Sequence, residues 1–547
     1  LLGLVDELIG LLRGIGPARV PPRPRPPPRP RPARPPPPPA APRSTPAGRG
    51  ARGRGMRIVH ELAELSVELT AATAEAASAF GDGEVFAEPY VERGRHVEVQ
   101  VMADGHGGVW ALGTRDCSLQ RRHQKVIEEA PAPGLDDALR TRLHDAAVAA
   151  AHAVGYRGAG TVEFLLAADG RPYFLEMNTR LQVEHPVTEA VFGLDLVALQ
   201  LRIAEGEPLP ATAPPAPHGH AVEARLYAED PAHDWQPQTG ALHTFHVPDE
   251  PGLRLDTGYT DGDTIGVHYD PMLAKVVAHA PTRTEAVRLL ARALERARIH
   301  GPVTNRELLV RSLRHPDFLA ARLDTGFYDR HLDALTPARG DSGPRLAALA
   351  AALADAAARQ HAAGPGPARF GAWRNISSQP RTKRYRAEPD GTEHEAAYRT
   401  TRTGPAPETG ERVVATAPDR VTLETGDGLT RHYDIAVHGD KAYVDTATGS
   451  YTLTALPRFT DPTDRTEPGS LLAPMPGTVV RLADGLAEGA AVEAGQPLIW
   501  LEAMKMEHRI LAPASGTLTA LHAAPGLQVE VGALLAVVQD VQEEPKQ

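Results

Sequence analysis

The stretch TVEFLLAADGRPYFLEMN (161–178) predicts a β-hairpin that brings two carboxylates together. If Asp169-Gly170 forms a two-residue turn, Glu163 pairs directly with Glu176, and their side chains lie about 5 Å apart on one face. Two carboxylates this close repel each other unless a cation lies between them. Hard oxygen ligands suit Mg²⁺ or Mn²⁺, ions that also bridge nucleotide phosphates. The alternative is that this face of the hairpin is only solvated.

Polar residues continue at every second position beyond Glu176. They are Asn178, Arg180, Gln182 and Glu184. This alternation predicts a strand with one polar face that ends at His185-Pro186. An arginine beside a metal can bind an oxyanion such as bicarbonate or phosphate through two parallel hydrogen bonds. A neighbouring glutamate can accept a proton from that anion. A strand with one polar face is otherwise usually a solvated one.

Three other stretches carry groups that bind anions or nucleotides. Residues 115–125 (RDCSLQRRHQK) are rich in hydrogen-bond donors, Glu88-Pro89-Tyr90-Val91 is followed by His96, and residues 48–57 alternate Gly with Arg before an expected helix. Backbone N–H groups of a Gly-rich loop can enclose phosphates. Each stretch also has a plain explanation, namely a solvated basic loop, an ordinary turn and Arg-Gly low complexity.

Lys505 lies between two copies of one sequence pattern near the C-terminus. LLAPMPGTVV (471–480) corresponds to ILAPASGTLT (510–519), and Val492, Gly495 and Leu498 correspond to Val529, Gly532 and Leu535. Short alternating strands broken by Gly and Pro predict a small two-fold β-barrel or flattened sandwich, with Lys505 at an exposed hairpin tip. The chain has six lysines against fifty-two arginines, so a primary amine in this position indicates an attachment point. The alternative is an unmodified surface lysine.

Composition restricts the class of protein. The 547 residues predict three or four domains, and no apolar run approaches the length of a membrane span. One cysteine, Cys117, excludes an internal disulfide framework and suits a reducing compartment, so we expect a cytoplasmic protein with no membrane partner. The net charge of −11 argues against nucleic acid as a partner. Residues 1–52 are rich in Pro and Arg and cannot build a core; we expect them to be disordered or translated out of frame.

The predicted fold class is multidomain α+β, with two α+β regions, an all-β middle domain and a C-terminal β-barrel or flattened sandwich. Helices are expected at about 57–80, 136–153, 187–205 and 345–363, and the last of these, rich in Ala, is interpreted as a connector. The expected domain boundaries are 53–180, 181–335, 336–367 for the connector, 368–465 and 470–540.

The names of these domains come from a resemblance to known families. EAMKM around Lys505 resembles the biotinyl domain of biotin-dependent carboxylases. Over about 53–335 the chain resembles the ATP-grasp biotin carboxylases, through the stretches RGMR, HVEVQV, RDCSLQRRHQK, EEAPAPGL, GTVEF, FLEMNTRLQVEHPVTE and GHAVEARLYAED. The whole resembles the α subunit of a bacterial acyl-CoA carboxylase of the acetyl-, propionyl- or methylcrotonyl-CoA type. The β segment after GAWRNISSQP (371–380) looks like the domain that contacts the carboxyltransferase subunit. The resemblance therefore implies a partial ATP-grasp region, a biotin carboxylase C-terminal domain, an all-β middle domain and a C-terminal biotinyl/lipoyl β-barrel.

The resemblance implies a role for each candidate residue. Glu163, Glu176 and Asn178 would bind Mg²⁺ or Mn²⁺. The nucleotide would contact Glu88, Pro89, Tyr90, Val91, His96, Gln120 and His123, with Gly53 and Gly55 of the Gly-rich loop. Bicarbonate would contact Lys125, Arg180, Gln182 and Val183, Glu184 would be the base, and Arg225 would stabilise the biotin enolate. Carboxyphosphate would break down to CO₂ and phosphate, and Lys505 would carry biotin.

The implied activity is that of a ligase in fatty-acid or branched-chain amino-acid metabolism. Expected partners are a carboxyltransferase β subunit and a biotin protein ligase, in a hetero-oligomer that meets acyl-CoA only through the partner subunit. The sequence departs from the family ahead of the Gly-rich loop, where about a hundred residues and two ATP-binding lysines are expected. Two functions therefore stay open, a working biotin carboxylase subunit and a chain that is only a biotin carrier. A third is another ATP-grasp ligase with a lipoyl-type carrier.

Overall fold

The structure is a computed structural model, and it describes residues 43–45, 57–85, 88–121, 124–336, 343–363, 379–401, 403–459, 469–503 and 506–540. The chain divides into two compact units. The first contains residues 1–224, 277–288 and 315–332, and the second contains residues 225–276, 289–314 and 333–547. No helix in the described part of the chain is both long enough and apolar enough to cross a membrane.

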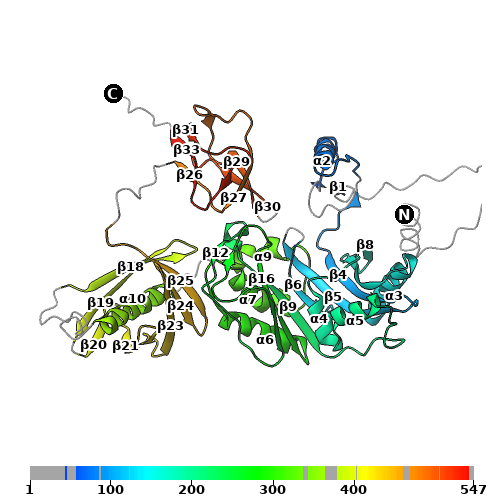
Figure 1. The fold of residues 1–547 in the computed structure, drawn as a ribbon, viewed down its shortest axis with the longest axis horizontal. Helices are drawn as coiled ribbons and strands as arrows, with labels where there is room; N and C mark the ends of the chain where they lie inside the picture. Colours follow the sequence, from blue (N-terminus) through cyan, green and yellow to red (C-terminus); the bar gives the residue numbers. More distant parts are fainter. Residues whose placement is uncertain are drawn as a thin grey trace, which may run out of the picture. The chain divides into compact units, whose positions relative to one another are not determined.

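An antiparallel sheet forms the centre of the first unit. Its strands lie in the order β6-β5-β4-β7-β8, and the first half of β9 pairs with β6 from Ile127↔Ala224 to Ala130↔Ala221 (Figure 1). The bounds are β4 (Arg95–Ala103), β5 (Val109–Arg121), β6 (Gln124–Ala130), β7 (Gly158–Leu166), β8 (Pro172–Asn178) and β9 (His220–Tyr227). This sheet sets side chains of five neighbouring strands next to one another.

Helices pack against apolar residues on both faces of the sheet. Val97, Val99 and Val101 of β4 pack on α3 (Asp137–Ala153) through Leu143 and Ala147. Met102 and Trp110 belong to another apolar cluster, with Leu196 and Leu199 of α5 (Leu196–Ala204). Successive strand residues point to opposite faces of a sheet, so the residues between the valines lie on the face that α3 does not cover.

The domain boundary expected at 180/181 is wrong. The helices α4 (His185–Phe192) and α5 lie beyond it, yet they share apolar clusters with strands of the first sheet. An apolar helix face has to be buried against the sheet beside it, so residues up to about 212 belong with this sheet. The expected single helix at 187–205 is in fact two helices, because Gly193 adopts a left-handed backbone (φ 62°) between them.

The hairpin β7–β8 pairs Glu163 with Glu176 as predicted, but the predicted two-residue turn is wrong. Near the turn Leu166 pairs with Pro172, which leaves five residues, 167–171, in the loop, with Gly170 at φ 77°. An irregularity between Glu163 and Phe164 then shifts the register by one residue and restores the carboxylate pair. β-bulges that re-aim a side chain are common beside functional sites.

The predicted continuation of this strand to residue 184 is also wrong. β8 ends at Asn178, and His185-Pro186 begins helix α4 where it was expected to end a strand. Proline suits the first turn of a helix, because its missing N–H has no intrahelical partner there. Residues 179–184 are therefore a loop, in which alternate residues need not share one face.

Short strands and further helices complete this part of the chain. The strands are β10 (Glu229–Asp230), β11 (Gln236–Pro237), β12 (Gly240–Ala241), β13 (Thr244–His246), β14 (Leu253–Thr257), β15 (Thr264–Ile265), β16 (Met272–Ala280) and β17 (Arg298–His300). The helices are η1 (Pro231–His233), α6 (Arg283–Arg296), α7 (Arg306–Arg314), α8 (Pro316–Leu319) and α9 (Phe327–Leu335). The N-terminal elements are β1 (Arg43–Thr45), β2 (Arg57–Val59), α2 (Leu65–Phe80) and β3 (Glu88–Pro89). Residues 57–64 thus do not join the expected helix.

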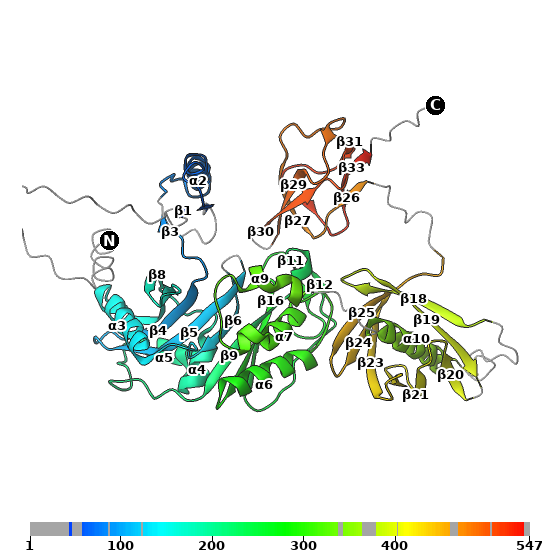
Figure 2. The ribbon, with the colours of Figure 1, turned by 180° about the vertical axis from the view of Figure 1, so that it is seen from behind.

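Helix α10 (Gly343–Ala362) is the core of the middle region and not a connector, which corrects the expectation for residues 336–367. Every residue from Leu346 to Ala354 is buried against an eight-stranded antiparallel sheet (Figure 2). The strands are β18 (Arg381–Glu388), β19 (Glu393–Thr401), β20 (Gly404–Pro407), β21 (Arg412–Thr416), β22 (Arg420–Glu424), β23 (Thr430–His438), β24 (Lys441–Thr446) and β25 (Gly449–Ala455). A helix that is apolar on all sides is typically buried, and small Ala side chains let strands approach it closely.

The C-terminal region is a sandwich of two four-stranded sheets, as predicted. The sheet orders are β26-β33-β31-β28 and β30-β29-β27-β32. The first sequence copy forms β26 (Ser470–Leu472), β27 (Gly477–Leu482), β28 (Ala491–Val492) and β29 (Pro497–Ala503), and the second forms β30 (Met506–Leu511), β31 (Gly516–Leu521), β32 (Gln528–Val529) and β33 (Leu534–Asp540). Exchanging the copies converts one sheet order into the other, so each copy completes the sheets of its twin. Equivalent residues such as Leu498 and Leu535 are both buried in the shared core.

The buried position of α10 predicts the effect of Leu349→Ala. Truncation of a fully buried leucine leaves a cavity and costs about 2–5 kcal/mol. Differential scanning calorimetry of the full chain should show one thermal transition moved to lower temperature. Arg359→Ala is the matched control, because this side chain is on the same helix and its ion pair with Asp355 is exposed. Equal effects of the two substitutions would mean that α10 is not a core helix.

Candidate active site

A polar face of β4 provides the base of the site. His96, Glu98 and Gln100 alternate with the three valines that pack on α3, and all three are buried. Glu98 lies opposite Arg115 of β5 on one side and opposite Glu163 of β7 on the other. Buried charged groups are rare unless they are paired, so a whole polar face under cover indicates a site and not a solvated surface.

Lys125 of β6 joins three carboxylates from different elements. Its Nζ lies 2.6 Å from Glu98 and 3.4 Å from Glu163 Oε1, and it also contacts Glu184, the residue before α4. Glu98 and Glu184 are fully buried and Lys125 is nearly so. The ammonium partly compensates negative charge that would otherwise be costly to bury.

The pKa values of the cluster follow from these contacts. Burial by itself would lower the pKa of Lys125, but the surrounding acids, Glu98 and Glu184 among them, raise it well above its ordinary value of 10.5. Burial would raise the pKa of Glu163, but the hydrogen bond from His96 Nε2 (3.0 Å) and the charge of Lys125 lower it to about 2. Near neutral pH the cluster therefore contains an ionised lysine and an ionised Glu163.

Arg115 was expected only as part of a basic loop, and the structure places it at the centre of a second buried network. It donates to Glu98 at 2.6 Å, Gln100 at 2.7 Å, Thr188 of α4 at 2.9 Å and Thr161 at 3.1 Å. Sequence reasoning missed Glu98 and Gln100, although the period-two alternation of HVEVQV was a sufficient signal. Arg115 orients Glu98, and Glu98 in turn holds Lys125.

Glu163, Glu176 and Asn178, the residues expected to bind a metal ion, lie together. Asn178 Nδ2 donates to Glu163 Oε1 at 2.8 Å and to Glu176 Oε1 at 3.2 Å, so one amide lies between both carboxylates. Glu163 and Asn178 are buried, whereas Glu176 is exposed. Carboxylate and amide oxygens are ligands of Mg²⁺ and Mn²⁺, and the exposed Glu176 leaves a side of the group open to a substrate.

The loop 179–184 brings some of its predicted residues to the cluster. Glu184 contacts Lys125, and Gln182 is buried with a side-chain Nε2 that has no hydrogen-bond partner among the described residues. Such a donor fits an anionic ligand. Val183 is half-buried. Arg180 is exposed, and its Nη1 donates to Leu181 O at 3.3 Å, so the structure does not bring this guanidinium to the other residues.

The residues expected around a nucleotide are described only in part. His96 Nδ1 lies 3.5 Å from Gln120 Oε1, and Tyr90 and Val91 are half-buried ahead of β4. Gly53, Gly55 and His123 lie outside the described residues, as do the side chains of Glu88 and Pro89. The nucleotide assignment of these residues stays a prediction.

Arg225 and Lys505 belong to the second unit. Arg225 is buried in β9, and its carbonyl accepts a hydrogen bond from Asn305 Nδ2 at 3.0 Å. Lys505 lies outside the described residues, but the strands on either side of it pair as far as Ala503↔Met506. Their roles in catalysis and attachment stay predictions.

Four family models match successive parts of the chain. They are "Carbamoyl-phosphate synthase L chain, ATP binding domain" over 43–212, "Biotin carboxylase C-terminal domain" over 223–330, "Methylcrotonyl-CoA carboxylase, alpha-subunit, BT domain" over 344–458 and "Biotin-requiring enzyme" over 470–538. The BT-domain match includes α10, in agreement with the burial of this helix.

Curated relatives match the chain along most of its length. Methylcrotonoyl-CoA carboxylase subunit alpha of Dictyostelium discoideum is 38% identical, and the match covers 89% of this chain and 73% of that protein. The biotin-dependent acyl-coenzyme A carboxylase alpha3 subunit of Mycobacterium leprae is 35% identical, with coverages of 91% and 73%.

Solved structures match the first part of the chain. A biotin carboxylase from Campylobacter jejuni, crystallised as a β,γ-ATP complex, is 40% identical with a TM-score of 0.52; the match covers 53% of this chain and 65% of that one. The biotin carboxylase domain of Hydrogenobacter thermophilus 2-oxoglutarate carboxylase, solved with MgADP, ADP and bicarbonate, is 38% identical with a TM-score of 0.53 and coverages of 55% and 66%. The chain thus spans about two thirds of the length of these solved chains.

The lowered pKa of Glu163 predicts a pH-dependent effect of Glu163→Gln. A carboxyl with a pKa of about 2 in the folded chain and 4.5 in the unfolded chain stabilises the fold above pH 4.5. This contribution, about 3 kcal/mol, is lost as the pH falls toward 2. The free energy of unfolding, measured with urea, should therefore differ less between wild type and Glu163→Gln as the pH falls below 4.5.

The control for this measurement is Glu205→Gln, which changes an exposed glutamate of the same unit. The free energy of unfolding of Glu205→Gln should differ little from that of wild type at every pH. If the difference in unfolding free energy between wild type and Glu163→Gln stays constant down to pH 2, the ion-paired state of Glu163 is contradicted.

Proposed function

The chain belongs to the α subunits of biotin-dependent acyl-CoA carboxylases, and on that basis we propose that it carboxylates biotin attached to its own Lys505, using ATP and bicarbonate. The observation that carries this proposal is the buried cluster in which Lys125 meets Glu98, Glu163 and Glu184 on one polar face. A buried cation held by three carboxylates from separate elements is a costly arrangement, which favours a catalytic role over a purely structural one.

We assign metal and nucleotide binding to one edge of this cluster. Glu163, Glu176 and Asn178 would hold Mg²⁺ or Mn²⁺, which neutralises phosphate charge when bound. His96 is anchored on Glu163 and borders Gln120, so both lie within reach of a nucleotide bound at this edge. The expected contacts of Glu88 to Val91, His123, Gly53 and Gly55 with ATP belong to the same proposal.

Bicarbonate would bind beside Lys125. The ammonium and the buried amide of Gln182 both attract an oxyanion, and Val183 would border it. Glu184 is proposed as the base that takes the bicarbonate proton, and its ion pair with Lys125 holds it at the anion. Arg180 has to turn away from Leu181 O to clamp the anion. Arg225 is proposed to stabilise negative charge on the biotin ureido group.

The carrier role rests on the duplicated sandwich. Biotin attached at Lys505 supplies a ureido nitrogen that accepts and releases a carboxyl group. The paired strands β29 and β30, joined through Ala503↔Met506, provide a rigid frame on both sides of the attachment lysine. A biotin protein ligase would add the group.

The partner is proposed to be a carboxyltransferase β subunit, which would bind the acyl-CoA. The BT-domain match and the methylcrotonoyl-CoA carboxylase relatives favour a branched acyl-CoA such as methylcrotonyl-CoA. Propionyl-CoA is the next candidate, because the middle domain also resembles that of propionyl-CoA carboxylases. We place the protein in the cytoplasm, as the single cysteine suggests.

Lys505→Arg should abolish biotinylation. A guanidinium keeps the positive charge, so the fold is retained, but it does not form the amide bond to biotin. Intact-mass spectrometry after co-expression with a biotin protein ligase measures the result. Lys441→Arg, on β24 of the middle region, should remain fully biotinylated. Biotin still attached to the Lys505→Arg chain would disprove the assignment.

Glu184→Gln should lower bicarbonate-dependent ATP cleavage with free biotin by at least about a hundredfold, since a positioned base contributes about 10²–10⁴ to a rate. Phosphate release measures the rate, and Glu205→Gln should leave it unchanged. If the wild-type chain releases no phosphate while Lys505 is biotinylated, the chain is a carrier without ATP chemistry.

A further inference from the structure

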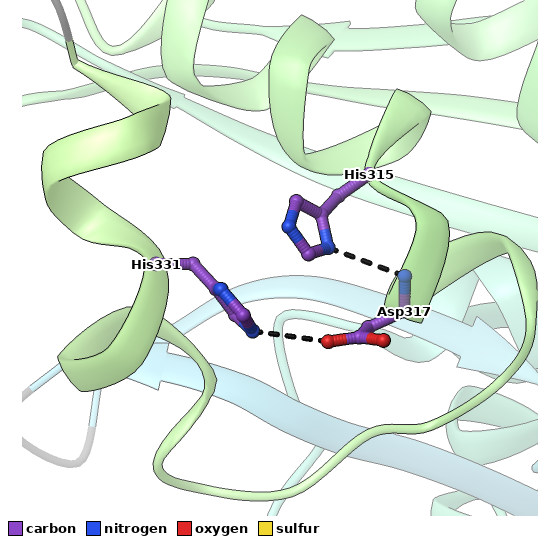
Figure 3. Close-up of side chains that lie close together, drawn as sticks. All are labelled: His315, Asp317 and His331. Carbon is purple, nitrogen blue, oxygen red and sulfur yellow. Dashed lines mark hydrogen bonds and ion pairs between the residues drawn. The ribbon is translucent and has the colours of Figure 1, made fainter.

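Two histidines and an aspartate meet at the corner between α8 and α9 of the first unit (Figure 3). His315 precedes α8, Asp317 is in its first turn, and His331 comes from α9. One donor atom from each residue lies within 4.8 Å of the others, and His331 Nε2 is 3.1 Å from Asp317 Oδ2. All three residues are half-buried.

A buried aromatic ring fixes the two imidazoles. Phe327 is fully buried, and its centroid lies 5.3 Å from the His315 ring and 5.0 Å from the His331 ring. The two imidazole centroids are 4.3 Å apart. Packing that holds side chains close to their bound geometry reduces the entropy lost when a ligand binds.

The contacts of Asp317 orient its two carboxylate oxygens. Arg322 donates to Asp317 Oδ1 at 2.9 and 2.5 Å, which leaves Oδ2 facing His331. His331 Nε2 is screened from solvent and makes no hydrogen bond of good geometry with a described residue.

We propose that His315, Asp317 and His331 form a binding site for a divalent transition-metal ion of the Zn²⁺ class. Two imidazole nitrogens and one carboxylate oxygen are a ligand set that Zn²⁺ and Co²⁺ accept, and three protein ligands leave a position for water. Mg²⁺ prefers oxygen ligands, so this site differs in kind from the group of Glu163, Glu176 and Asn178. The inference is independent of the proposed carboxylase activity.

The structure also shows what binding requires. Ligand atoms around tetrahedral Zn²⁺ lie roughly 3.3 Å apart. The three donor atoms lie within 4.8 Å of one another, so no pair has to close by more than about 1.5 Å. His331 Nε2 and Asp317 Oδ2 are already at such a distance. His315 Nδ1 accepts a hydrogen bond from the Asp317 N–H at 3.2 Å, which orients this imidazole.

A bound ion would connect α8 to α9. The carbonyl of Phe318 in α8 accepts from Arg283 at 2.9 Å, and Arg283 binds Glu129 at the end of β6. The corner is therefore tied to the main sheet, and an ion that holds α8 to α9 should raise the resistance of this region to heat.

The test is Zn²⁺ binding to the full chain, freed of metal with a chelator and measured by calorimetry in a large excess of Mg²⁺. Wild type should bind Zn²⁺ and melt at a higher temperature with it. His331→Gln and Asp317→Asn should bind at least about tenfold more weakly and lose the thermal shift. His361→Gln, which removes an exposed imidazole of α10, should behave like wild type. In Co²⁺ titrations, a visible absorption band should form with wild type and not with His331→Gln.

Arg322→Gln tests the same site without removing a ligand. It frees Asp317 Oδ1 and removes a nearby positive charge, so Zn²⁺ should bind more tightly than to wild type. Circular dichroism in chelator checks that each variant is folded. Equal Zn²⁺ affinity of folded wild type and folded His331→Gln would overturn the proposal, as would weaker binding by folded Arg322→Gln.

Discussion

The placement of one ammonium group among three buried carboxylates is the constraint on which the first unit depends. Glu98, Glu163 and Glu184 come from two strands and the start of a helix, and near neutral pH they are tolerated because Lys125 and Arg115 lie between them. Removing a partner from a buried ion pair is much more costly than removing an exposed one. These charges meet only because the strands have this register, α4 begins directly after Glu184, and α3 packs against the opposite face of the sheet.

The same cluster explains why its chemistry is confined to one face of the sheet. Val97, Val99 and Val101 pack one face of β4 against α3. The alternating residues His96, Glu98 and Gln100 therefore lie on the opposite face of the strand. In an environment with little water, the fields of Lys125 and Arg115 act on a bound anion with little screening. The position of Glu163 beside both His96 and Lys125 couples the proposed metal edge to the proposed bicarbonate edge.

The second unit builds two separate apolar cores, one in the middle region and one in the C-terminal sandwich. The C-terminal sandwich uses duplication, because each copy provides two strands to each sheet and neither copy has a complete core alone. The middle region wraps one sheet around α10, whose Ala residues permit close approach. From sequence alone, an Ala-rich core helix looks the same as a solvent-exposed spacer, because Ala favours helices in every environment. Only the residues that pack around α10 show that it is a core helix.

Local patterns determined much of this protein before its structure was considered. The duplicated C-terminal frame follows from residue types and spacings, because period and turn chemistry act over short distances. The carboxylase family followed from the resemblance of whole motifs to known proteins, and the pairing of Glu163 with Glu176 was predicted although its turn was not. The tertiary structure decided the rest. The bulge that restores the carboxylate register, the end of β8 at Asn178, the burial of α10 and the meeting of Lys125 with Glu98 and Glu184 depend on which surfaces pack together. Contacts between residues far apart in sequence are set by burial and charge compensation, and no local pattern encodes them.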